Sequence, residues 1–279
     1  MNIYKHNNHA GNHADTLKHL CLIYFLKSIK KPYNSISYID THAGNGLYKL
    51  DDNYIKKNEE YQNGISKLLI VKTKDPYIRF YIKTINNINQ SSKIKFYPGS
   101  PKIVQHLTNK KDELYFFELI ENEYKSLQKN FSKYSNIKII KNDGFDFFKS
   151  IKINKEKNGV ILIDPVYKNK DDYLKVINLV KNYHIQFENK IVIIWYPVLD
   201  RIETNNFIDE FKRTGIQNIL RIEMPIQNDN SEKDMTGSGL IIINSHKKTA
   251  QSIRGTIIEL QSILQFKDNK KKVIVNNLK

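Results

Sequence analysis

Apolar residues recur along the chain in blocks whose spacing alternates between helical and strand-like. Residues 14–30 follow helical spacing, and Pro32 comes directly afterwards, so a helix is expected over this stretch. Short apolar runs bounded by polar turns predict strands at residues 35–40, 114–120, 137–140, 160–163 and 191–196. Two later runs, 219–224 and 240–244, predict a closing hairpin. Helical stretches lie between most of these strands, which indicates a doubly wound α/β sheet.

Residues 50–95 interrupt this alternation. They are polar and rich in lysine, with helical character, so they predict a small helical subdomain inserted into a single domain that spans residues 1–279. The chain shows no internal repeat. Near its end, the run Lys270-Lys271-Lys272 is expected to be a solvated turn.

Polar or acidic residues follow four of the predicted strands. Ligands of open α/β sheets bind just outside the carboxyl ends of the strands, so these residues are expected at one edge. The first strand ends at Asp40 and turns through Gly44 and Gly46, which let the backbone approach a ligand closely. The next three end at Glu118, at Asn142-Asp143-Gly144 and at Asp164. Any one of these carboxylates could simply cap a helix, but four in consecutive order match the layout of an S-adenosylmethionine site.

The distance between the glycines and the second carboxylate argues against a nicotinamide dinucleotide site. A dinucleotide-binding fold places its ribose-binding acid about 20 residues after the glycines. Here Glu118 lies far beyond Gly46. The insertion at 50–95 accounts for this gap in a methyltransferase, where Glu118 would grip the ribose diol.

Residues 160–167, Val-Ile-Leu-Ile-Asp-Pro-Val-Tyr, carry the most chemical information. Asp164-Pro165-Val166-Tyr167 differs at one position from Asp-Pro-Pro-Tyr, the motif by which methyltransferases hold an exocyclic amine. The lone pair of the adenine amine is delocalised into the ring, which makes the amine a poor nucleophile. A carboxylate and a backbone carbonyl that accept its two hydrogens push the lone pair toward a methyl donor, while an aromatic ring holds the base face. The alternative is a buried strand that merely ends in a proline turn.

The N-terminal segment carries four histidines, at positions 6, 9, 13 and 19. His9 and His13 are spaced like a helical pair of metal ligands, but neither a cysteine nor a clear carboxylate ligand accompanies them, so no metal is expected. A capped helix start is one interpretation. Another is a segment folded over the active site, in which Tyr4 stacks, Lys18 meets phosphate and His19 touches the cofactor.

Composition narrows the class of protein. The chain has 279 residues, 45 Lys and Arg against 29 Asp and Glu, a net charge of +16 and one cysteine, Cys21. A single cysteine excludes a disulfide scaffold and a cysteine-based zinc site, and fits a reducing cytosol. The apolar run from Leu20 to Leu26 is too short to span a membrane. The positive charge favours a polyanionic partner, although the abundance of Lys, Ile and Asn is also typical of an AT-rich genome.

Several longer motifs together resemble one family closely, RlmJ, the bacterial 23S ribosomal RNA adenine-N6 methyltransferases. The residues that carry the resemblance are Tyr4-Lys5-His6, the run from His9 to Asp15, Asp40-Thr-His-Ala-Gly44, Tyr97-Pro-Gly-Ser-Pro101, Asp143-Gly144, and Met235-Thr236 with Ser238-Gly239. The resemblance extends over nearly the whole chain. It implies a Rossmann-like class I methyltransferase with an inserted helical subdomain, which methylates a single adenine in the peptidyl-transferase region of the large-subunit RNA.

The resemblance also implies roles for individual residues. Those expected to bind the cofactor S-adenosylmethionine are His19, His42, Ser100, Glu118, Asp143 with Gly144, and Asp164. Asp164 would also be the catalytic proton acceptor. Those expected to contact the RNA substrate are Tyr4, His6, Lys18 and Tyr167. Ser100 would lie at a turn before a helix, near the methionine carboxylate.

Two positions depart from the family pattern. Val166 replaces the second proline of the motif, and Gly237 replaces a small residue at the start of a strand. The expected partner is 23S ribosomal RNA. The protein is expected to be a cytoplasmic monomer that binds neither a membrane nor a metal. Two alternatives stay open: a DNA adenine-N6 methyltransferase, which uses the same motif, and a catalytically weak RNA-binding protein in which Val166 has eroded the site.

Overall fold

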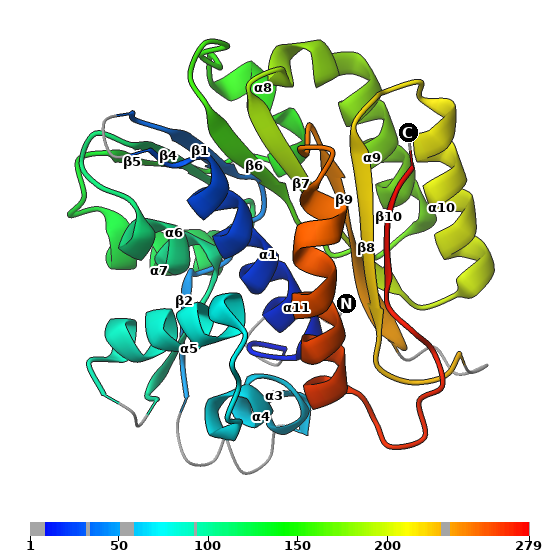
Figure 1. Ribbon diagram of the computed structural model, residues 1–279. Helices are drawn as coiled ribbons and strands as arrows, with labels where there is room; N and C mark the ends of the chain where they lie inside the picture. The colour runs from blue at the N-terminus through cyan, green and yellow to red at the C-terminus, as the bar shows by residue number, and fades with distance from the viewer. Residues whose placement is uncertain (1–8, 32–33, 51–58, 92–93, 230–234, 279) are drawn as a thin grey trace.

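The computed structural model describes residues 9–31, 34–50, 59–91, 94–229 and 235–278. Within these residues, an eight-stranded sheet has the order β10-β8-β9-β7-β6-β1-β4-β5 (Figure 1). The strands are β1 (Ser37–Asp40), β4 (Glu113–Phe117), β5 (Ile137–Ile140), β6 (Gly159–Ile163), β7 (Lys190–Val198), β8 (Ile219–Pro225), β9 (Gly237–Ile243) and β10 (Ile274–Asn277).

The order of the strands confirms the doubly wound, Rossmann-like α/β sheet. β1 pairs in parallel with both β4 and β6, β4 with β5, and β6 with β7. The chain thus moves outward from β1 to β4 and β5, then returns to the other side of β1 for β6 and β7. This reversal leaves a crevice beyond the carboxyl ends of β1 and β6, where ligands of such sheets bind.

The predicted hairpin is also confirmed, because β8 and β9 pair in antiparallel fashion from Ile219–Ile243 to Pro225–Gly237. β9 lies between β7 and β8 and runs antiparallel to both. Strand β10, which the sequence analysis missed, pairs with the outer edge of β8. The lysine run that precedes β10 is a connection without helix or strand, as expected.

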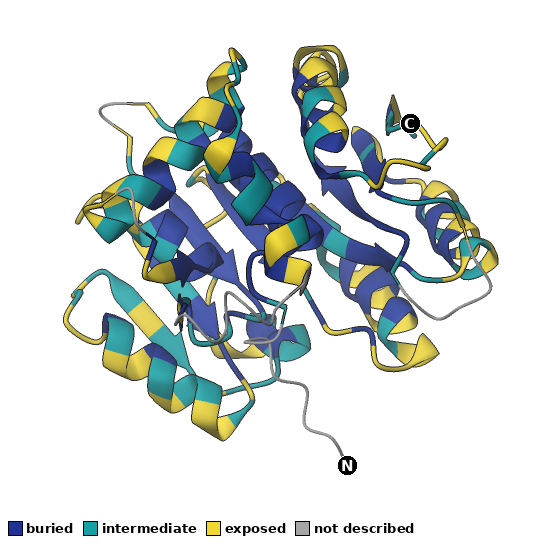
Figure 2. Cartoon of the chain, turned by 90° about the horizontal axis from the view of Figure 1, so that it is seen from below, coloured by how far each residue is buried: buried dark blue, intermediate teal, exposed yellow. Residues whose placement is uncertain are grey.

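Helices cover both faces of the sheet, and each face has its own apolar core (Figures 1 and 2). One core includes side chains of α1 (His13–Ile29), α6 (Ser100–Leu107), α7 (Glu121–Phe131) and α11 (Thr249–Leu264). The other includes side chains of α8 (Phe147–Ser150), α9 (Lys170–Tyr183), α10 (Arg201–Arg213) and the short 3₁₀ helix η3 (His184–Phe187). Because β6 and β7 are covered on both faces, nearly all of their residues are buried, which explains their continuous apolar runs.

Helix α1 confirms the predicted helix and lies deep in the molecule. The side chain of Asn12 caps its first turn by accepting from the Asp15 amide at 2.9 Å. Every residue from His13 to Leu26 is buried, and the helix packs against β6, β7, β9 and the helices beside them. Its polar residues are therefore held inside the protein and need internal partners.

The stretch between β1 and β4 contains β2 (Leu47–Lys49), α3 (Glu59–Asn63), α4 (Ile65–Ile70), α5 (Pro76–Asn89) and β3 (Phe96–Pro98). β2 and β3 form a small antiparallel pair that the sequence analysis did not predict. Apolar side chains of α4 and α5, such as Leu68 and Ile85, belong to the same core as α1. The helical character expected for residues 50–95 is present, and an independent subdomain there stays a prediction.

None of the helices among the described residues has the length and apolar character needed to cross a membrane.

Candidate active site

A cavity of about 480 Å³ opens at the carboxyl ends of β1, β4, β5, β6 and β7. Its walls include all seven residues expected from the sequence to bind a cofactor: His19, His42, Ser100, Glu118, Asp143, Gly144 and Asp164. These residues come from α1, from the turns after β1, β4, β5 and β6, and from the start of α6, yet the topology brings them to one edge of the sheet. The volume lies in the range of small-molecule sites.

The first wall is built around Asp40, the last residue of β1. Its Oδ2 accepts hydrogen bonds from the hydroxyls of Tyr38 and Ser100, both at 2.7 Å. Burial raises the pKa of Asp40 to about 6, although the two hydroxyl donors oppose this shift. The other oxygen, Oδ1, is buried without a hydrogen-bond partner among the described residues. Asp40 thereby fixes Ser100 at the N-terminus of α6, where the unpaired backbone amides favour an anion.

The turn after β1 is fastened to the end of β4 by Glu118. The carboxylate accepts from the Gly44 amide at 2.9 Å and from the Ile120 amide at 2.7 Å. Gly44 and Gly46 have φ angles of +59° and +73°, in the region that favours glycine. Burial raises the pKa of Glu118, and the backbone donors counteract that effect. The result is a carboxylate in a fixed orientation on a closely approaching backbone.

Asp143 and Gly144 form the third wall, at the end of β5. Asp143 caps the 3₁₀ helix η2 (Gly144–Asp146) by accepting from the Phe145 amide at 2.9 Å. A Cβ atom on Gly144 would lie 1.9 Å from the carbonyl oxygen of Thr41, so only glycine fits there. The ring of His42 meets the ring of Phe145 edge to face, with centroids 5.2 Å apart. Burial lowers the pKa of His42 to about 4, so this imidazole is neutral at pH 7.

Helix α1 contributes a buried ion triad. The Lys18 ammonium lies 2.9 Å from Asp15 Oδ1 and 2.5 Å from Asp164 Oδ2. Burial alone would lower the pKa of Lys18, but the two carboxylates outweigh it and raise that pKa above its ordinary value. His19, the residue directly after Lys18, forms a hydrogen bond through Nδ1 with the Tyr97 hydroxyl at 2.8 Å. Lys18 therefore stays charged beside Asp164.

The contact with RNA phosphate expected for Lys18 stays a prediction. Lys18 lines the cavity, but its side chain is only 6% exposed and its ammonium is held between Asp15 and Asp164. Tyr4 and His6, the other N-terminal residues expected to contact RNA, lie outside the described residues.

Tyr167, the aromatic residue of the motif, points away from the cavity. Its ring is 6% exposed and packs against Tyr173, with centroids 4.4 Å apart, in the core beneath the strand ends. Its hydroxyl donates to the Trp195 carbonyl at 2.6 Å. The φ angle of +51° is unusual for tyrosine, and such strain concentrates at functional sites. Asp164, Pro165 and Val166 line the cavity, whereas Tyr167 does not.

The part of the cavity beyond β6 contains residues that were not predicted from the sequence. Trp195, Pro197 and Leu199 line it from β7 and the turn that follows, and Met235 lines it from the segment before β9. The sequence carried a signal for these residues. The strand predicted at 191–196 ends in Trp-Tyr, with Pro197 directly after it, and ligands of such sheets bind beyond the carboxyl ends of the strands.

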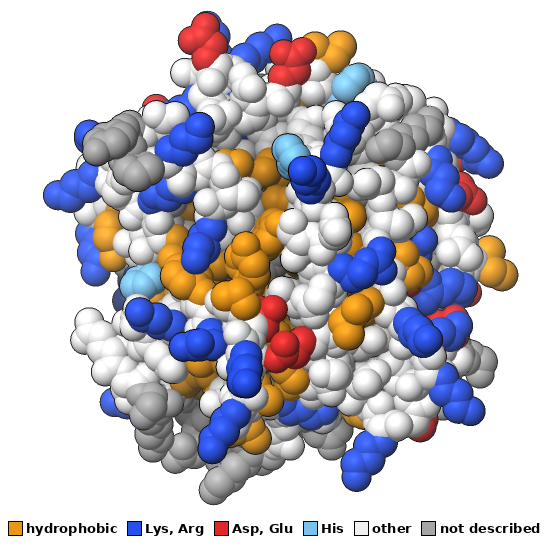
Figure 3. Space-filling view, in the orientation of Figure 1, with side chains coloured by type: hydrophobic (Ala, Val, Ile, Leu, Met, Phe, Trp, Pro, Cys, Tyr) orange, Lys and Arg blue, Asp and Glu red, His pale blue; other side chains and the backbone are white. Residues whose placement is uncertain are grey.

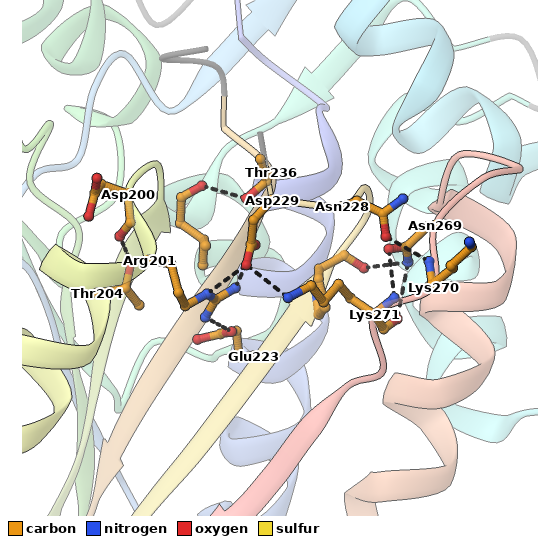
Figure 4. Close-up of polar contacts among 12 residues, drawn as sticks. Asp200, Arg201, Thr204, Glu223, Asn228, Asp229, Thr236, Asn269, Lys270 and Lys271 are labelled. Carbon is orange, nitrogen blue, oxygen red and sulfur yellow. Dashed lines mark hydrogen bonds and ion pairs between the residues drawn. The ribbon is translucent and has the colours of Figure 1, made fainter. Parts of the chain in front are cut away.

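A polar network holds these outer elements together (Figure 4). Arg201, the first residue of α10, bonds to Glu223 of β8 at 2.6 Å and to Asp229 after β8 at 3.2 Å. Asp229 also accepts from Lys271 at 2.9 Å, and Arg221 donates to Glu223 at 2.6 Å. The network joins the turn after β7 to the β8–β9 connection, which carries Met235.

His9 and His13, which are spaced like a pair of metal ligands, lie in different environments. His9 pairs with Glu60 at 2.9 Å, and burial lowers the pKa of His13 to about 4. Within the part of the chain that the structure describes, no three His, Cys, Asp or Glu side chains are grouped to hold a metal ion.

Comparison with known proteins then decides the family. Residues 33–272 match the family model described as "Ribosomal RNA large subunit methyltransferase D, RlmJ". The chain belongs to the RlmJ family. It is 35% identical to ribosomal RNA large subunit methyltransferase J of Escherichia coli K12, over 94% of this chain and 93% of the relative. It is 37% identical to the Haemophilus influenzae protein of the same name, over 86% of each chain.

A solved structure shares the fold over nearly the whole chain. The crystal structure of LPL1258 from Legionella pneumophila matches with a TM-score of 0.85 at 30% identity, over 96% of this chain and 98% of that one. The family resemblance expected from the motifs is therefore confirmed, and with it a methyltransferase that acts on ribosomal RNA.

Proposed function

We propose that this RlmJ-family chain transfers a methyl group from S-adenosylmethionine to the N6 amine of one adenine in 23S ribosomal RNA. The observation that carries the proposal is the single cavity in which Asp164 and Pro165 meet the polar ends of β1, β4 and β5. The adenine in the peptidyl-transferase region, implied by the family resemblance, is the proposed target.

The residues of the cavity fit the cofactor. Glu118 would offer its carboxylate to the ribose diol of the cofactor, and Asp143 would accept from the amine of its adenine. Ser100 at the start of α6 and the close backbone of Gly44 suit the charged methionine end. The neutral His42 ring and the Phe145 ring would give the adenine of the cofactor uncharged aromatic neighbours. When bound, the cofactor supplies an electrophilic methyl group.

Asp164 is the proposed proton acceptor. Its carboxylate and the Pro165 carbonyl would accept the two hydrogens of the adenine amine and so direct the nitrogen lone pair toward the methyl group. Asp164 would take up the amine proton that the nitrogen releases on methylation and would pass it on to solvent. Lys18 keeps this carboxylate ionised, because an ammonium at 2.5 Å favours the charged form. We assign this role to Lys18.

The surface charge suits an RNA substrate. The net charge is +16, and on the face seen in Figure 3 Lys and Arg side chains outnumber acidic ones and are widely spread. Lys168 and Lys175 line the cavity itself. We propose that the enzyme acts as a monomer in the cytoplasm, where ribosomal RNA is processed. The target base has to leave its stack to reach Asp164.

A methyl-transfer assay tests the proposal. The purified protein is incubated with labelled S-adenosylmethionine and either 23S rRNA lacking the modification, fully modified rRNA or duplex DNA. We expect N6-methyladenosine in the unmodified rRNA alone. Asp164→Ala should lower the rate by roughly 10²–10⁴-fold while the protein stays folded. Equal methylation of duplex DNA would favour a DNA enzyme, and no transfer by the wild type would favour an RNA-binding protein without activity.

A further inference from the structure

The order of the strands divides the cavity into two halves. β1, β4 and β5 lie on one side of Asp164, and their ends carry the groups proposed above for the cofactor. β7 lies on the other side, next to β6. The residues that line this second half, Trp195, Pro197, Leu199 and Met235, are mostly apolar. A base that presents its amine to Asp164 from opposite the cofactor therefore lies over the end of β7.

The motif tyrosine does not supply an aromatic surface for that base. The Tyr167 ring is buried against Tyr173 and Phe207 in the core below, with centroids 4.4 and 6.2 Å away. Its hydroxyl is bound to the carbonyl of Trp195. Turning the ring into the cavity would break this bond and empty a packed site in the core.

Trp195 is placed where such a surface is needed. It lines the cavity and is only partly buried. The centroid of its ring lies 6.0 Å from the Lys18 ammonium, and that ammonium is bound to Asp164 at 2.5 Å. Trp195 also follows Ile194, the residue in register with Ile163 directly before Asp164. The indole thus lies beside the carboxylate that receives the amine.

We propose that Trp195 is the flat wall on which the target adenine stacks, and that Tyr167 is the support that holds the Trp195 backbone. This inference rests on the proposed function and names a further residue for it. An aromatic face accepts any base, so Trp195 gives affinity while Asp164 and Pro165 select the amine. Pro197, Leu199 and Met235 exclude water around the stack, which strengthens the hydrogen bonds at Asp164.

Trp195 also touches both apolar cores, so a purely structural role has to be distinguished. Trp195→Phe keeps an aromatic face, and Trp195→Leu keeps only bulk. We expect Trp195→Leu to lower kcat/KM for the rRNA by roughly tenfold to a hundredfold, with the dissociation constant of S-adenosylmethionine unchanged within about twofold. Trp195→Phe should recover most of the loss. Phe145→Leu, in the other half of the cavity, should instead weaken the binding of S-adenosylmethionine.

The protein offers a direct optical test as well, because Trp195 is its only tryptophan. Stacking of the base on the indole should quench the emission of the wild type when unmodified rRNA is added, and Tyr167→Phe should retain most of this quenching. A wild-type kcat/KM in Trp195→Leu would overturn the inference and leave the proposed function standing. A parallel loss of cofactor affinity and melting temperature that Trp195→Phe does not rescue would also overturn it.

A wild type that transfers no methyl group would overturn the proposed function before any variant is compared. In that case the quenching still decides the inference: emission that is unaffected by saturating rRNA would rule out stacking on Trp195.

Discussion

One carboxylate oxygen of Glu118 accepts from Gly44 in the turn after β1, and the other accepts from Ile120 in the loop after β4. A carboxylate has enough lone pairs to accept from ribose hydroxyls as well. We expect Glu118→Ala to weaken binding of S-adenosylmethionine by about 1.5–3 kcal/mol, because bonds to a charged acceptor are lost. Isothermal calorimetry measures this. The matched control is Glu121→Ala, which removes an exposed carboxylate that pairs only with lysines in the described contacts. Equal affinities for both variants would contradict the assignment of Glu118.

Val166 departs from the family motif at the turn that aims the Pro165 carbonyl. A proline there would restrict residue 165 to extended backbone and so preorganise the turn. The Val166 side chain is 38% exposed, and none of the hydrogen bonds recorded for the described residues is donated by its amide. Val166→Pro should therefore fold normally and keep the methylation rate or raise it by up to about fivefold. Single-turnover kinetics provides the measurement. A large drop would mean that this amide or side chain has a partner in the substrate complex.

At the scale of the elements, the network of Figure 4 has a buried and an exposed end. Glu223 is 1% exposed and depends on Arg201 and Arg221, whereas Asp229 is 29% exposed. We expect Arg201→Leu to lower the free energy of unfolding by about 1.5–3 kcal/mol, because a buried carboxylate loses a charged donor. Asp229→Asn should cost about 0–1 kcal/mol. Urea unfolding of wild type and both variants measures these losses in the free energy of unfolding. Equal losses would show that the network does not depend on the burial of Glu223.

The long elements could be predicted from the sequence because their apolar runs are strong. The strand at 137–140 matches to the residue, and the helix expected at 14–30 is displaced by one position. The strand expected to reach residue 120 ends at Phe117, because Glu118 turns to bind Gly44 and Leu119 is 59% exposed. β2, β3 and β10 are three or four residues long, too short for a periodicity to be recognised.

The candidate site was predictable wherever a strand end carries a carboxylate. The direction of Tyr167 was not, because its positive φ angle has no signal in the sequence and its ring packs against Phe207 of α10, which is distant in sequence. The buried partners of Lys18 were also inaccessible, since one of them lies 146 residues away. Spacing along a chain indicates which residues share an edge but does not give the rotation of each side chain.

For the whole molecule, buried histidines predict how stability changes with pH. Burial lowers the pKa values of His13 and His42 from 6.5 to about 4. Between these values the unfolded chain binds protons that the folded protein does not, so stability falls as pH drops from about 6.5. At pH 5 each histidine lowers the free energy of unfolding by about 2 kcal/mol, because pH 5 lies about 1.5 units below the unfolded pKa and each unit is worth about 1.4 kcal/mol. Asp40, whose pKa is raised to about 6, takes up a proton in the folded state first and offsets part of this loss.

We therefore expect the melting temperature to be lower at pH 5 than at pH 7. His13→Leu, which lies outside the proposed catalytic groups, should flatten this dependence. Thermal unfolding of both proteins between pH 5 and pH 8 tests the expectation. The same slope in wild type and variant would show that His13 does not contribute.

The position of α1 has a consequence for how the protein is made. This first helix is buried against β6, β7 and β9, and β9 begins only at residue 237. During synthesis α1 leaves the ribosome long before the strands that cover it, so its apolar side chains stay uncovered until those strands have been synthesised. Asp164 likewise meets Lys18 only when the helix docks. Chains that end before β9 therefore lack the packing that fixes Lys18 beside Asp164, and we expect activity to begin only after β9 has been synthesised.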